Sequence, residues 1–584
     1  MIERAPVAHR IATPPRAEGC FFRGSGRARF GVVHKPSVRH ALGIGLVIVP
    51  PFGYEAICTH RSLRHLAEAG ARAGLVAVRL DLDGTGDSEG NDLEHGRLDA
   101  WLASIADACD LARGSGANRI VLAGVRLGAT LASLAAAQRN DVAGVIAIAA
   151  VPSGKALVRE GRALQMQLAL APAPDGRTSD DVHELVGFAL TGETRTALSQ
   201  IDLVKAQRAP APAMLIVDRD DLAGNDKWTA ALRALGVEVE VQRLPGYVAM
   251  VADPHCSEVP HAIVEAAIRF AVTRPALPVT SSAEVIASPR ALLGGDVTED
   301  LVELDNWMTG IATRGHTRSE RAVILLNAGA TYRIGPNRLH VELARRLAAR
   351  GDLVLRVDLS GLGDSAARPG AAENVVYSDH AIADVGLAVA WARQQGAHKV
   401  AVVGLCSGAY HALKAAVDGQ LIDTVVPINP LTFFWKPGMP LDFAAFRVTT
   451  ETARYQKSLA SPSSWLKLLR GDVNVVRVAR ILGERARDVA EHRARDVARR
   501  LRVPLTDDLG GELLALGRRD IAMRFIFAGD DPGHSLLVEQ AGSALPRLTR
   551  TGKLSMHVVA AADHTFTPRW SHGLLLDAIS RAVS

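Results

Sequence analysis

The chain has 584 residues, of which 48% are hydrophobic and 22% charged, and it carries a formal net charge of +5. This length exceeds what one hydrophobic core supports, and so mild a charge gives no reason to expect nucleic acid as a partner. Five scattered cysteines suggest neither disulfides nor a metal site, and no apolar run is long enough for stable membrane insertion. Because the N-terminus lacks the apolar core of a signal peptide, we expect a cytoplasmic protein, without a cofactor.

An internal repeat organises the chain. Residues 74–90 (GLVAVRLDLDGTGDSEG) correspond to residues 352–368 (DLVLRVDLSGLGDSAAR), and both copies contain the pattern D-L-x-G-x-G-D-S. Each copy follows an Ala- and Arg-rich helical stretch and precedes a long helical pattern, at about 97–113 and at about 379–396. Strands that alternate with helices predict right-handed βαβ units, which form a parallel sheet with helices on both faces.

The long separation between the two copies predicts two full-size α/β domains rather than a solenoid. The stretch VTRPALPVTSSAEV (272–285) is rich in Pro, Ser and Thr and is typical of a linker. We expect the first domain to span residues 1–275 and the second to span residues 276–584.

In the first domain, a sharp turn joins an apolar strand to a helix in IVLAGVRLGATLASLAA (120–136). Its glycines have the spacing of the G-x-S-x-G nucleophile elbow, but Arg126 stands at the central position. A guanidinium stays protonated and cannot attack a carbonyl. We therefore expect this domain to be catalytically inactive, with a helical lid at about 152–210.

The other positions that accompany such an elbow are also altered in the first domain. An acidic pair ending in Asp221 follows a strand, but Tyr247 stands where a histidine is expected, and His255 lies farther along. Two roles remain open for Arg126. It binds an anion such as a carboxylate or phosphate, or it forms a structural ion pair with Asp221 or Asp87, which is the commoner arrangement.

The second domain repeats the strand, turn and helix in VAVVGLCSGAYHALKAA (400–416). Cys406 stands at the centre of this elbow, between Gly404 and Gly408. A thiol at this point lies at a helix N-terminus, where the helix dipole favours the reactive thiolate. Ser407 comes one position too late, because such a turn exposes only its central residue.

The order of strand, glycine-rich loop, elbow, lid and late histidine resembles the α/β-hydrolase superfamily. More narrowly, the first half resembles one class of hydrolases associated with bacterial exosortase systems, through PPFGYEAICTH (50–60) and GVRLGATLA (124–132). The second half is similar to the other class, through GATYRIGPNRLHVELARRLAARG (329–351) and GLCSGA (404–409). The resemblance implies two tandem α/β-hydrolase domains, each a mostly parallel sheet with helices on both faces and a helical lid insertion.

The resemblance also implies a catalytic triad in the second domain, in the chain order nucleophile, acid, histidine. Cys406 is the expected nucleophile and His564, which follows a late strand, the expected base. The acid follows another strand, in the pair Asp530-Asp531. The superfamily pattern favours Asp531, with Asp530 as the alternative.

Three further features of the second domain are expected around this triad. The backbone N–H groups of Ser407 and Ala330 form the oxyanion hole. A lid spans about 431–520, and its aromatic start, PLTFFWKPGMP (430–440), lines an apolar pocket that suits an acyl chain. The basic amphipathic stretch at 475–503 is either a solvated helix or a docking face for an acidic acyl-carrier protein or for the phosphate of coenzyme A.

These features leave two classes of function. In the first, Cys406 takes an acyl group from an ester or thioester and passes it to water, as an acyl hydrolase, or to an alcohol or amine, as an acyltransferase. By resemblance, cysteine elbows of this superfamily occur in dienelactone hydrolases and polyhydroxyalkanoate synthases. In the second, both halves are inactive and the chain is a ligand-binding or scaffolding protein. We expect one active and one inactive domain.

Overall fold

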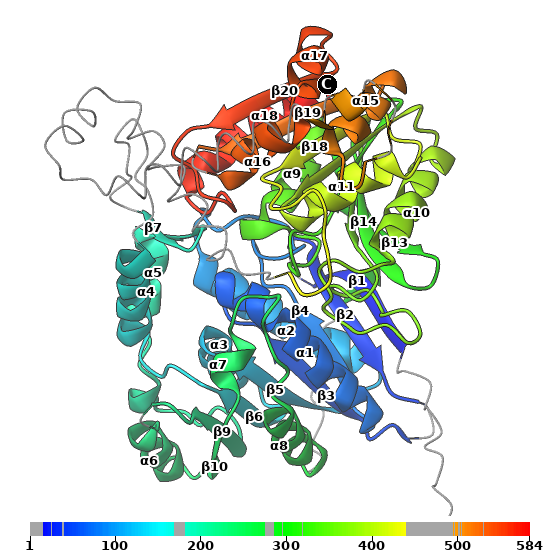
Figure 1. Ribbon diagram of the computed structural model, residues 1–584. Coiled ribbons are helices and arrows are strands. Elements are labelled where there is room, and N and C mark those ends of the chain that lie inside the picture. Colours follow the sequence, from blue (N-terminus) through cyan, green and yellow to red (C-terminus); the bar gives the residue numbers. More distant parts are fainter. Residues whose placement is uncertain are drawn as a thin grey trace, which may run out of the picture. The chain divides into compact units, whose positions relative to one another are not determined.

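The computed structural model describes residues 16–584 except residues 25, 38–39, 169–181, 223, 275–284, 295, 318, 440–493, 496, 500, 502, 504 and 530. The chain divides into two compact units, which meet in sequence at Leu301 and Val302. The boundary expected at residues 275 and 276 falls in a stretch outside the described residues and stays a prediction. The chain contains two large sheets, and most strands of each sheet belong to one unit (Figure 1).

The first sheet has nine strands in the order β10-β9-β6-β5-β3-β4-β2-β1-β11. Six of them, from β10 to β4, run parallel, and β2, β1 and β11 add an antiparallel edge. The strands are β1 (Arg16–Arg23), β2 (Arg29–Lys35), β3 (Ile44–Val49), β4 (Val76–Leu80), β5 (Arg119–Val125), β6 (Val142–Ile148), β9 (Ala213–Arg219), β10 (Glu238–Leu244) and β11 (Ile286–Ser288).

Helices cover both faces of this sheet, which is why its central strands are continuous apolar runs. Every residue of β3 (IGLVIV) and β6 (VAGVIAI) is buried, as expected for parallel strands between two helical layers. The helices are α1 (Tyr54–Arg72), α2 (Arg97–Gly114), α3 (Leu127–Ala137), α6 (Asp226–Ala234), α7 (Tyr247–Met250) and α8 (His261–Val272). The pair α1 and α8 packs together, and so does the pair α2 and α3.

Between β6 and β9 lies the insertion that was expected as the first lid. It contains α4 (Gly154–Leu168), α5 (Gly192–Ser199) and a short 3-10 turn, η2 (Leu203–Lys205). It also contains a β-hairpin, β7 (Val182–Leu185) with β8 (Phe188–Thr191), which the sequence analysis did not predict. The hairpin turn is made by Val186 and Gly187, both in the left-handed backbone region.

The second sheet repeats the plan, in the order β12-β13-β14-β16-β15-β17-β18-β19-β20. The strands from β16 to β20 run parallel, and β14 pairs antiparallel with β16. They are β12 (Arg290–Leu293), β13 (Val297–Leu304), β14 (Met308–Arg314), β15 (Arg321–Leu325), β16 (Leu353–Asp358), β17 (Lys399–Leu405), β18 (Thr424–Ile428), β19 (Ala522–Ala528) and β20 (Leu554–Val559).

Two hydrophobic cores lie on the two faces of the second sheet. One core packs under α10 (Ala381–Gln394), α11 (Ser407–Val417), α15 (Leu509–Arg518), α16 (Pro532–Ala541) and α17 (Ala544–Arg550), and the other under α9 (Leu339–Ala348) and α18 (Arg569–Ala582). A 3-10 turn, η3 (Pro336–Arg338), leads into α9. The predicted α/β fold, with mostly parallel sheets between helical layers in two domains, is therefore confirmed.

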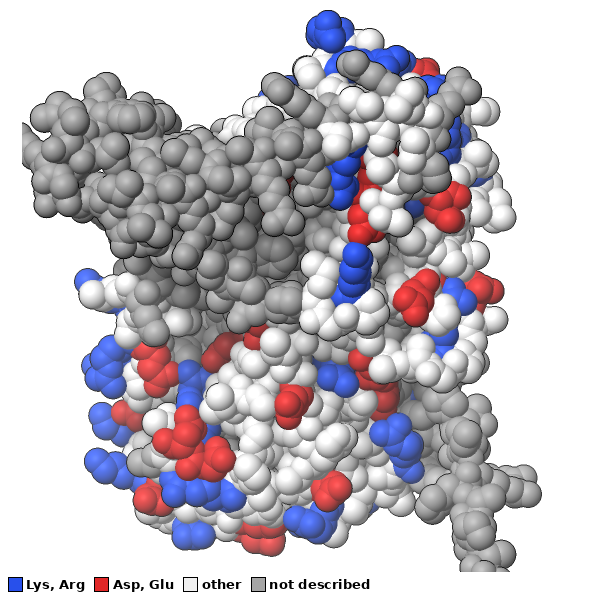
Figure 2. Space-filling model, viewed as in Figure 1, with Lys and Arg blue, Asp and Glu red and all other residues white. Residues whose placement is uncertain are grey.

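Much of the second lid, expected at about 431–520, lies outside the described residues, as does most of the basic stretch at 475–503. Among the helices that the structure does describe, none is long and apolar enough to cross a bilayer. On the face drawn in Figure 2, Lys and Arg side chains alternate with Asp and Glu, and the described residues form no large patch of one sign there.

Candidate active site

The turn between β17 and α11 has the backbone of a nucleophile elbow. Cys406 lies between the two elements with φ 58° and ψ −116°, a conformation that non-glycine residues rarely adopt. A Cβ atom on Gly404 would overlap the backbone of Gly408, and one on Gly408 would lie 2.6 Å from the carbonyl oxygen of Asn327. Only glycine fits at both positions, and the two glycines let the chain turn sharply enough to present Cys406.

Cys406 differs from the other cysteines of the chain in its surroundings. Cys20, Cys58 and Cys109 are buried, and burial raises the pKa of each thiol to about 12. Cys256 is exposed on the surface, whereas Cys406 is half-buried at the N-terminus of α11. It therefore combines partial exposure with a position at the start of a helix.

Asp531 and His564 come together at the carboxyl ends of two neighbouring parallel strands. Asp531 follows β19, begins α16 as its N-cap, and accepts a 2.8 Å hydrogen bond from the N–H of Gly533. The Nδ1 of His564, in the loop after β20, donates to its other carboxylate oxygen over 2.6 Å. Because a carboxylate accepts only, this bond places a proton on Nδ1. Asp530, the alternative acid, lies outside the described residues.

The ring of His564 also interacts with Cys406. Burial alone would lower the pKa of His564, but the hydrogen bond to Asp531, together with the nearby Cys406 thiol and the charge of Asp531, raises it to about 10. The imidazole is therefore protonated at neutral pH. The structure thus joins Asp531 and His564 by a hydrogen bond and places this pair near Cys406.

Asn429 is a buried residue that the sequence analysis missed. It follows β18 in the left-handed conformation, with φ 46°. Its Nδ2 donates to the carbonyl oxygen of His564 over 2.7 Å, and its Oδ1 accepts from the N–H of Ala528, at the end of β19, over 2.8 Å. One amide thus ties the histidine loop to the strand that leads to Asp531. An Asn before a Pro is a turn signal in the sequence, but its partners come from distant strands.

The side chain of Ser407 is buried and does not face a substrate. Its hydroxyl accepts a 2.9 Å hydrogen bond from the N–H of Gly329 in the loop after β15. This bond fixes the loop that carries Ala330 against the start of α11. The two backbone groups expected to form the oxyanion hole, those of Ser407 and Ala330, therefore belong to segments that are directly joined.

The first unit contains the same turn with different chemistry. Arg126, between β5 and α3, has φ 53° and ψ −119°, and so matches the conformation of Cys406. Its Nε donates to Glu55 over 3.2 Å, and its Nη2 donates to Glu160. The prediction that Arg126 pairs with Asp221 or Asp87 is therefore wrong.

The true partners of Arg126 come from α1 and α4, which fold over the turn and which no local pattern reveals. Asp221 pairs instead with Arg219. The hydroxyl of Tyr247 donates to Glu55 over 3.4 Å, and the guanidinium of Arg219 lies 4.5 Å from the centre of the Tyr247 ring. Burial raises the pKa of Glu55, and the charge of Arg126 opposes that rise. In the described part of the first unit, the turn thus places Arg126 among charged and phenolic groups.

Among the described residues, no group of three or more His, Cys, Asp or Glu side chains is arranged to hold a metal ion.

Residues 323–574 match the model of the alpha/beta hydrolase family, and Cys406, Asp531 and His564 all lie within this stretch. No curated protein matches the chain. Similar solved structures include Est1E from Butyrivibrio proteoclasticus with bound ferulic acid, at 19% identity over 44% of this chain and 98% of that one, with a TM-score of 0.33. A hydrolase from Agrobacterium vitis is 17% identical over 44% of this chain and 100% of that one, with a TM-score of 0.31.

The family match supports the α/β-hydrolase superfamily that the sequence predicts, for the second half of the chain. The narrower likeness to the two exosortase-associated classes stays a prediction.

The first prediction concerns pH and stability. The folded-state pKa of His564 is raised to about 10 from an ordinary 6.5, so its protonated ring stabilises the fold fully below pH 6.5. We expect the free energy of unfolding in urea to lose this contribution as the pH rises from about 6.5 to about 10. The loss should be smaller in Asp531→Asn, which removes one of the two groups that hold the proton. An identical pH dependence in both proteins would contradict the pairing.

The second prediction concerns Asn429→Ala, which leaves the His564 carbonyl and the end of β19 without their shared amide. Small misplacements of reacting groups cost up to about 100-fold in rate, so we expect kcat to fall about 10- to 100-fold with little change in KM. The pH profile of kcat should also shift, because the backbone that carries the His564 ring loses a hydrogen bond that fixes it. Asn225→Ala, which removes a hydrogen-bonded amide from the first unit, is the control. Wild-type kcat in Asn429→Ala would show that Asn429 has no positioning role.

The third prediction concerns Arg126→Met in the full chain. Glu55 and Glu160 then lack their counter-charge, and we expect the free energy of unfolding at pH 7 to fall by about 1–2 kcal/mol. The loss should shrink as the pH is lowered, because burial raises the pKa of Glu55 and this carboxylate then becomes protonated. Arg208→Met, which removes a surface guanidinium bonded to the Asn140 amide, should have little effect. Equal stability of Arg126→Met and wild type at pH 7 would argue against a structural role.

Proposed function

We propose that the second unit is an acyl hydrolase or acyltransferase that acts on an ester or thioester through Cys406, Asp531 and His564. The observation that carries this proposal is the position of the His564 ring, which is hydrogen-bonded to Asp531 and lies near the thiol of a strained elbow. Covalent acyl transfer requires a nucleophile, a base beside it, and a carboxylate that orients the base.

In the first step, the Sγ of Cys406 adds to the carbonyl carbon of the substrate. The oxygen becomes an oxyanion, which accepts hydrogen bonds from the N–H groups of Ser407 and Ala330. The bond from the carbonyl carbon to the leaving oxygen or sulfur then breaks. The leaving group takes a proton from His564 and departs as an alcohol or thiol, and the acyl group remains on Cys406 as a thioester.

In the second step, His564 accepts a proton from water while the water oxygen adds to the thioester carbonyl. The carbon–sulfur bond breaks, the carboxylic acid leaves, and Cys406 returns as a thiolate beside the protonated ring. If an alcohol or amine replaces water, the product is an ester or an amide. The same residues therefore serve hydrolysis and transfer, and the acceptor decides between them.

Two features of this arrangement favour thioester substrates. Attack by a thiolate on a thioester exchanges one sulfur for another, so the attacking and leaving groups are chemically alike. The elbow helix also presents aromatic rather than charged groups, because Tyr410 lies one turn beyond Cys406 and contacts Tyr377. An acyl group carried by an acyl-carrier protein or by coenzyme A is the substrate class that we propose.

We propose that the first unit takes no part in the chemistry. Its elbow presents Arg126, which forms ion pairs with two carboxylates. A guanidinium cannot act as a nucleophile. With its charge already compensated, this guanidinium is a poor site for a further anion. A structural role for the cluster is therefore the better supported of the two roles left open by the sequence.

The fourth prediction tests the nucleophile. We expect Cys406→Ala to abolish hydrolysis of an activated thioester by the full chain, and wild type incubated with acyl thioesters to gain the mass of one acyl group on Cys406. Cys256→Ala, which removes the exposed cysteine, should retain both activities. Ser407→Ala should still form the acyl-enzyme, but more slowly, because the loop of Gly329 and Ala330 loses its anchor.

Residual hydrolysis by Cys406→Ala would show that another nucleophile, in either unit, performs the reaction. Absence of any acyl-enzyme and of any turnover with thioesters and esters alike would favour the alternative, a non-catalytic ligand-binding or scaffolding protein.

A further inference from the structure

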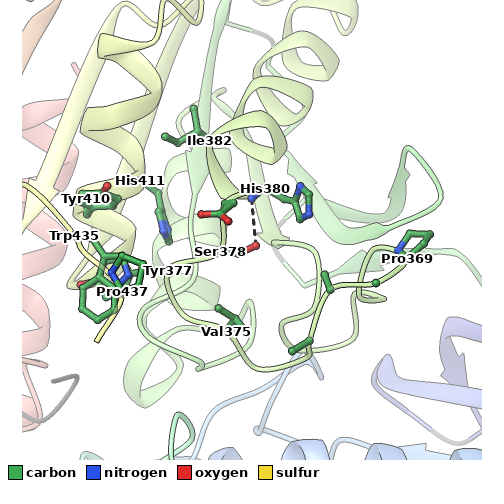
Figure 3. A pocket seen from close by; sticks show the side chains of 14 residues that line it. Pro369, Val375, Tyr377, Ser378, His380, Ile382, Tyr410, His411, Trp435 and Pro437 are labelled. Carbon is green, nitrogen blue, oxygen red and sulfur yellow. Dashed lines mark hydrogen bonds between the residues drawn. The ribbon is translucent and has the colours of Figure 1, made fainter. Parts of the chain in front are cut away.

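The loop of residues 327–333, which follows β15, reaches the elbow of the second unit directly. A Cβ atom on Gly408 would lie 2.6 Å from the carbonyl oxygen of Asn327, and the N–H of Gly329 donates to the hydroxyl of Ser407 over 2.9 Å. A hollow of about 740 Å³ also lies beside α11 (Figure 3), but its described walls do not include Cys406. The loop is therefore the feature that touches the elbow itself.

This loop contains a β-turn in which one N–H group is left without a partner. The N–H of Thr331 donates to the carbonyl oxygen of Ala328 over 3.1 Å and closes the turn. The N–H of Gly329 is held by Ser407. Between these two, the N–H of Ala330 has no hydrogen-bond partner in the part of the chain that the structure describes. An N–H group that is to bind an oxyanion must be available in this way.

The side chain of Asn327 holds the far end of the turn. It is buried, and its Nδ2 donates to the carbonyl oxygen of Thr331 over 3.0 Å and to Asp358 over 2.9 Å. Its Oδ1 accepts from the N–H of Leu359 over 2.8 Å. The reverse orientation of the amide would place two donors together at Leu359, so these bonds define which atom is the nitrogen. The Ala330 N–H thus lies between a peptide group tied to the elbow and one tied to the end of β16.

The first unit builds the same sheet and the same close approach without this amide. A Cβ atom on Gly128 would lie 2.4 Å from the carbonyl oxygen of Pro50, just as one on Gly408 would meet that of Asn327. Pro50 therefore stands at the position of Asn327, and proline has no polar side chain. The fold does not require an amide at this point. The amide is present in the unit whose elbow carries a thiol and absent from the unit whose elbow carries Arg126.

The carboxylate that bonds to Asn327 has a different status, because both units use it. Asp358 and Asp81 each accept a hydrogen bond from the backbone N–H six residues later, at 3.1 Å and 2.8 Å. In the second unit, one oxygen of Asp358 also accepts from Asn327 and, over 2.6 Å, from the N–H of Arg333. The two ends of the loop therefore meet at one oxygen. Removing Asp358 would disturb the fold as well as the loop, whereas Asn327 acts on the loop.

We propose that Asn327 is a positioning residue for acyl transfer, which fixes the turn so that the Ala330 N–H meets the oxyanion formed on the substrate carbonyl. The proposal rests on the proposed function, because this oxyanion forms only when Cys406 adds to a carbonyl carbon. Asn327 acts through the backbone of the turn. A donor that is held in place before the reaction needs no reorganisation when the charge develops. Loss of Asn327 should therefore slow the steps that form an oxyanion and leave the thiol unchanged.

The fifth prediction compares two reactions of Cys406 in Asn327→Ala. Acylation by an octanoyl thioester passes through an oxyanion, whereas alkylation by iodoacetamide displaces iodide from a saturated carbon and forms none. We expect the single-turnover rate constant of acylation, followed by the mass of the protein, to fall about 10- to 100-fold. The rate of alkylation should not change. Asn225→Ala is the matched control, since its Nδ2 likewise donates to an aspartate and a carbonyl oxygen, and it should keep both wild-type rates.

A second variant, Asn327→Asp, keeps the shape of the side chain and tests the inference even if Asn327→Ala does not fold. Burial beside Asp358 raises the pKa of the new carboxyl, which is therefore protonated at lower pH and then donates one hydrogen bond. A carboxylate cannot donate to Thr331 and is repelled by Asp358. We expect the acylation rate of this variant to fall, relative to wild type, as the pH rises and the group ionises. Its alkylation should follow the wild-type pH profile.

Two results would overturn this inference alone. One is wild-type acylation, shown by the rate of a folded Asn327→Ala or, where only Asn327→Asp folds, by an unchanged pH profile. The other is an equal loss of acylation and alkylation, which indicates a general disturbance of the elbow. If wild type itself forms no acyl-enzyme with thioesters or esters, the proposed function is wrong and this inference is wrong with it. A loss confined to acylation supports both.

Discussion

The close approach of two backbone segments at the elbow is the constraint on which the second unit depends. Gly404 and Gly408 are packed so tightly against each other and against Asn327 that neither can carry a side chain. This contact forces the residue between them into a left-handed backbone and presents its side chain at the carboxyl end of the sheet. The loops that supply Asp531 and His564 reach the same edge, because parallel strands end there together.

The fold was largely predictable because its signals are local and repeated. Buried parallel strands read as continuous apolar runs, and the two D-L-x-G-x-G-D-S loops mark equivalent points of two equivalent sheets. The elbow was equally visible, since it needs glycines at fixed spacing on either side of one residue. The sequence left open whether Asp530 or Asp531 is the acid. In the structure, Asp531 is hydrogen-bonded to His564.

What the sequence could not show depends on contacts between distant segments. Asn429 reads as an ordinary turn residue, yet its amide joins a strand end to a loop 135 residues away. Ser407 reads as a misplaced nucleophile, yet its hydroxyl anchors the loop of Gly329. The predicted partners of Arg126 were wrong for the same reason, because Glu55 and Glu160 reach it only through the packing of α1 and α4.

The two elbows hold residues as different as arginine and cysteine in almost the same backbone conformation. The strain of that backbone conformation comes from the Cβ atom, which both residues have. The strain therefore depends little on the side-chain atoms beyond Cβ. Folding therefore exerts little selection on the central residue, while it fixes the glycines around it. One backbone arrangement can therefore present either a thiol or a guanidinium at the end of its strand, and the residues around it decide the chemistry. These residues differ as well, because Ala149 occupies the left-handed position after β6 that Asn429 occupies after β18.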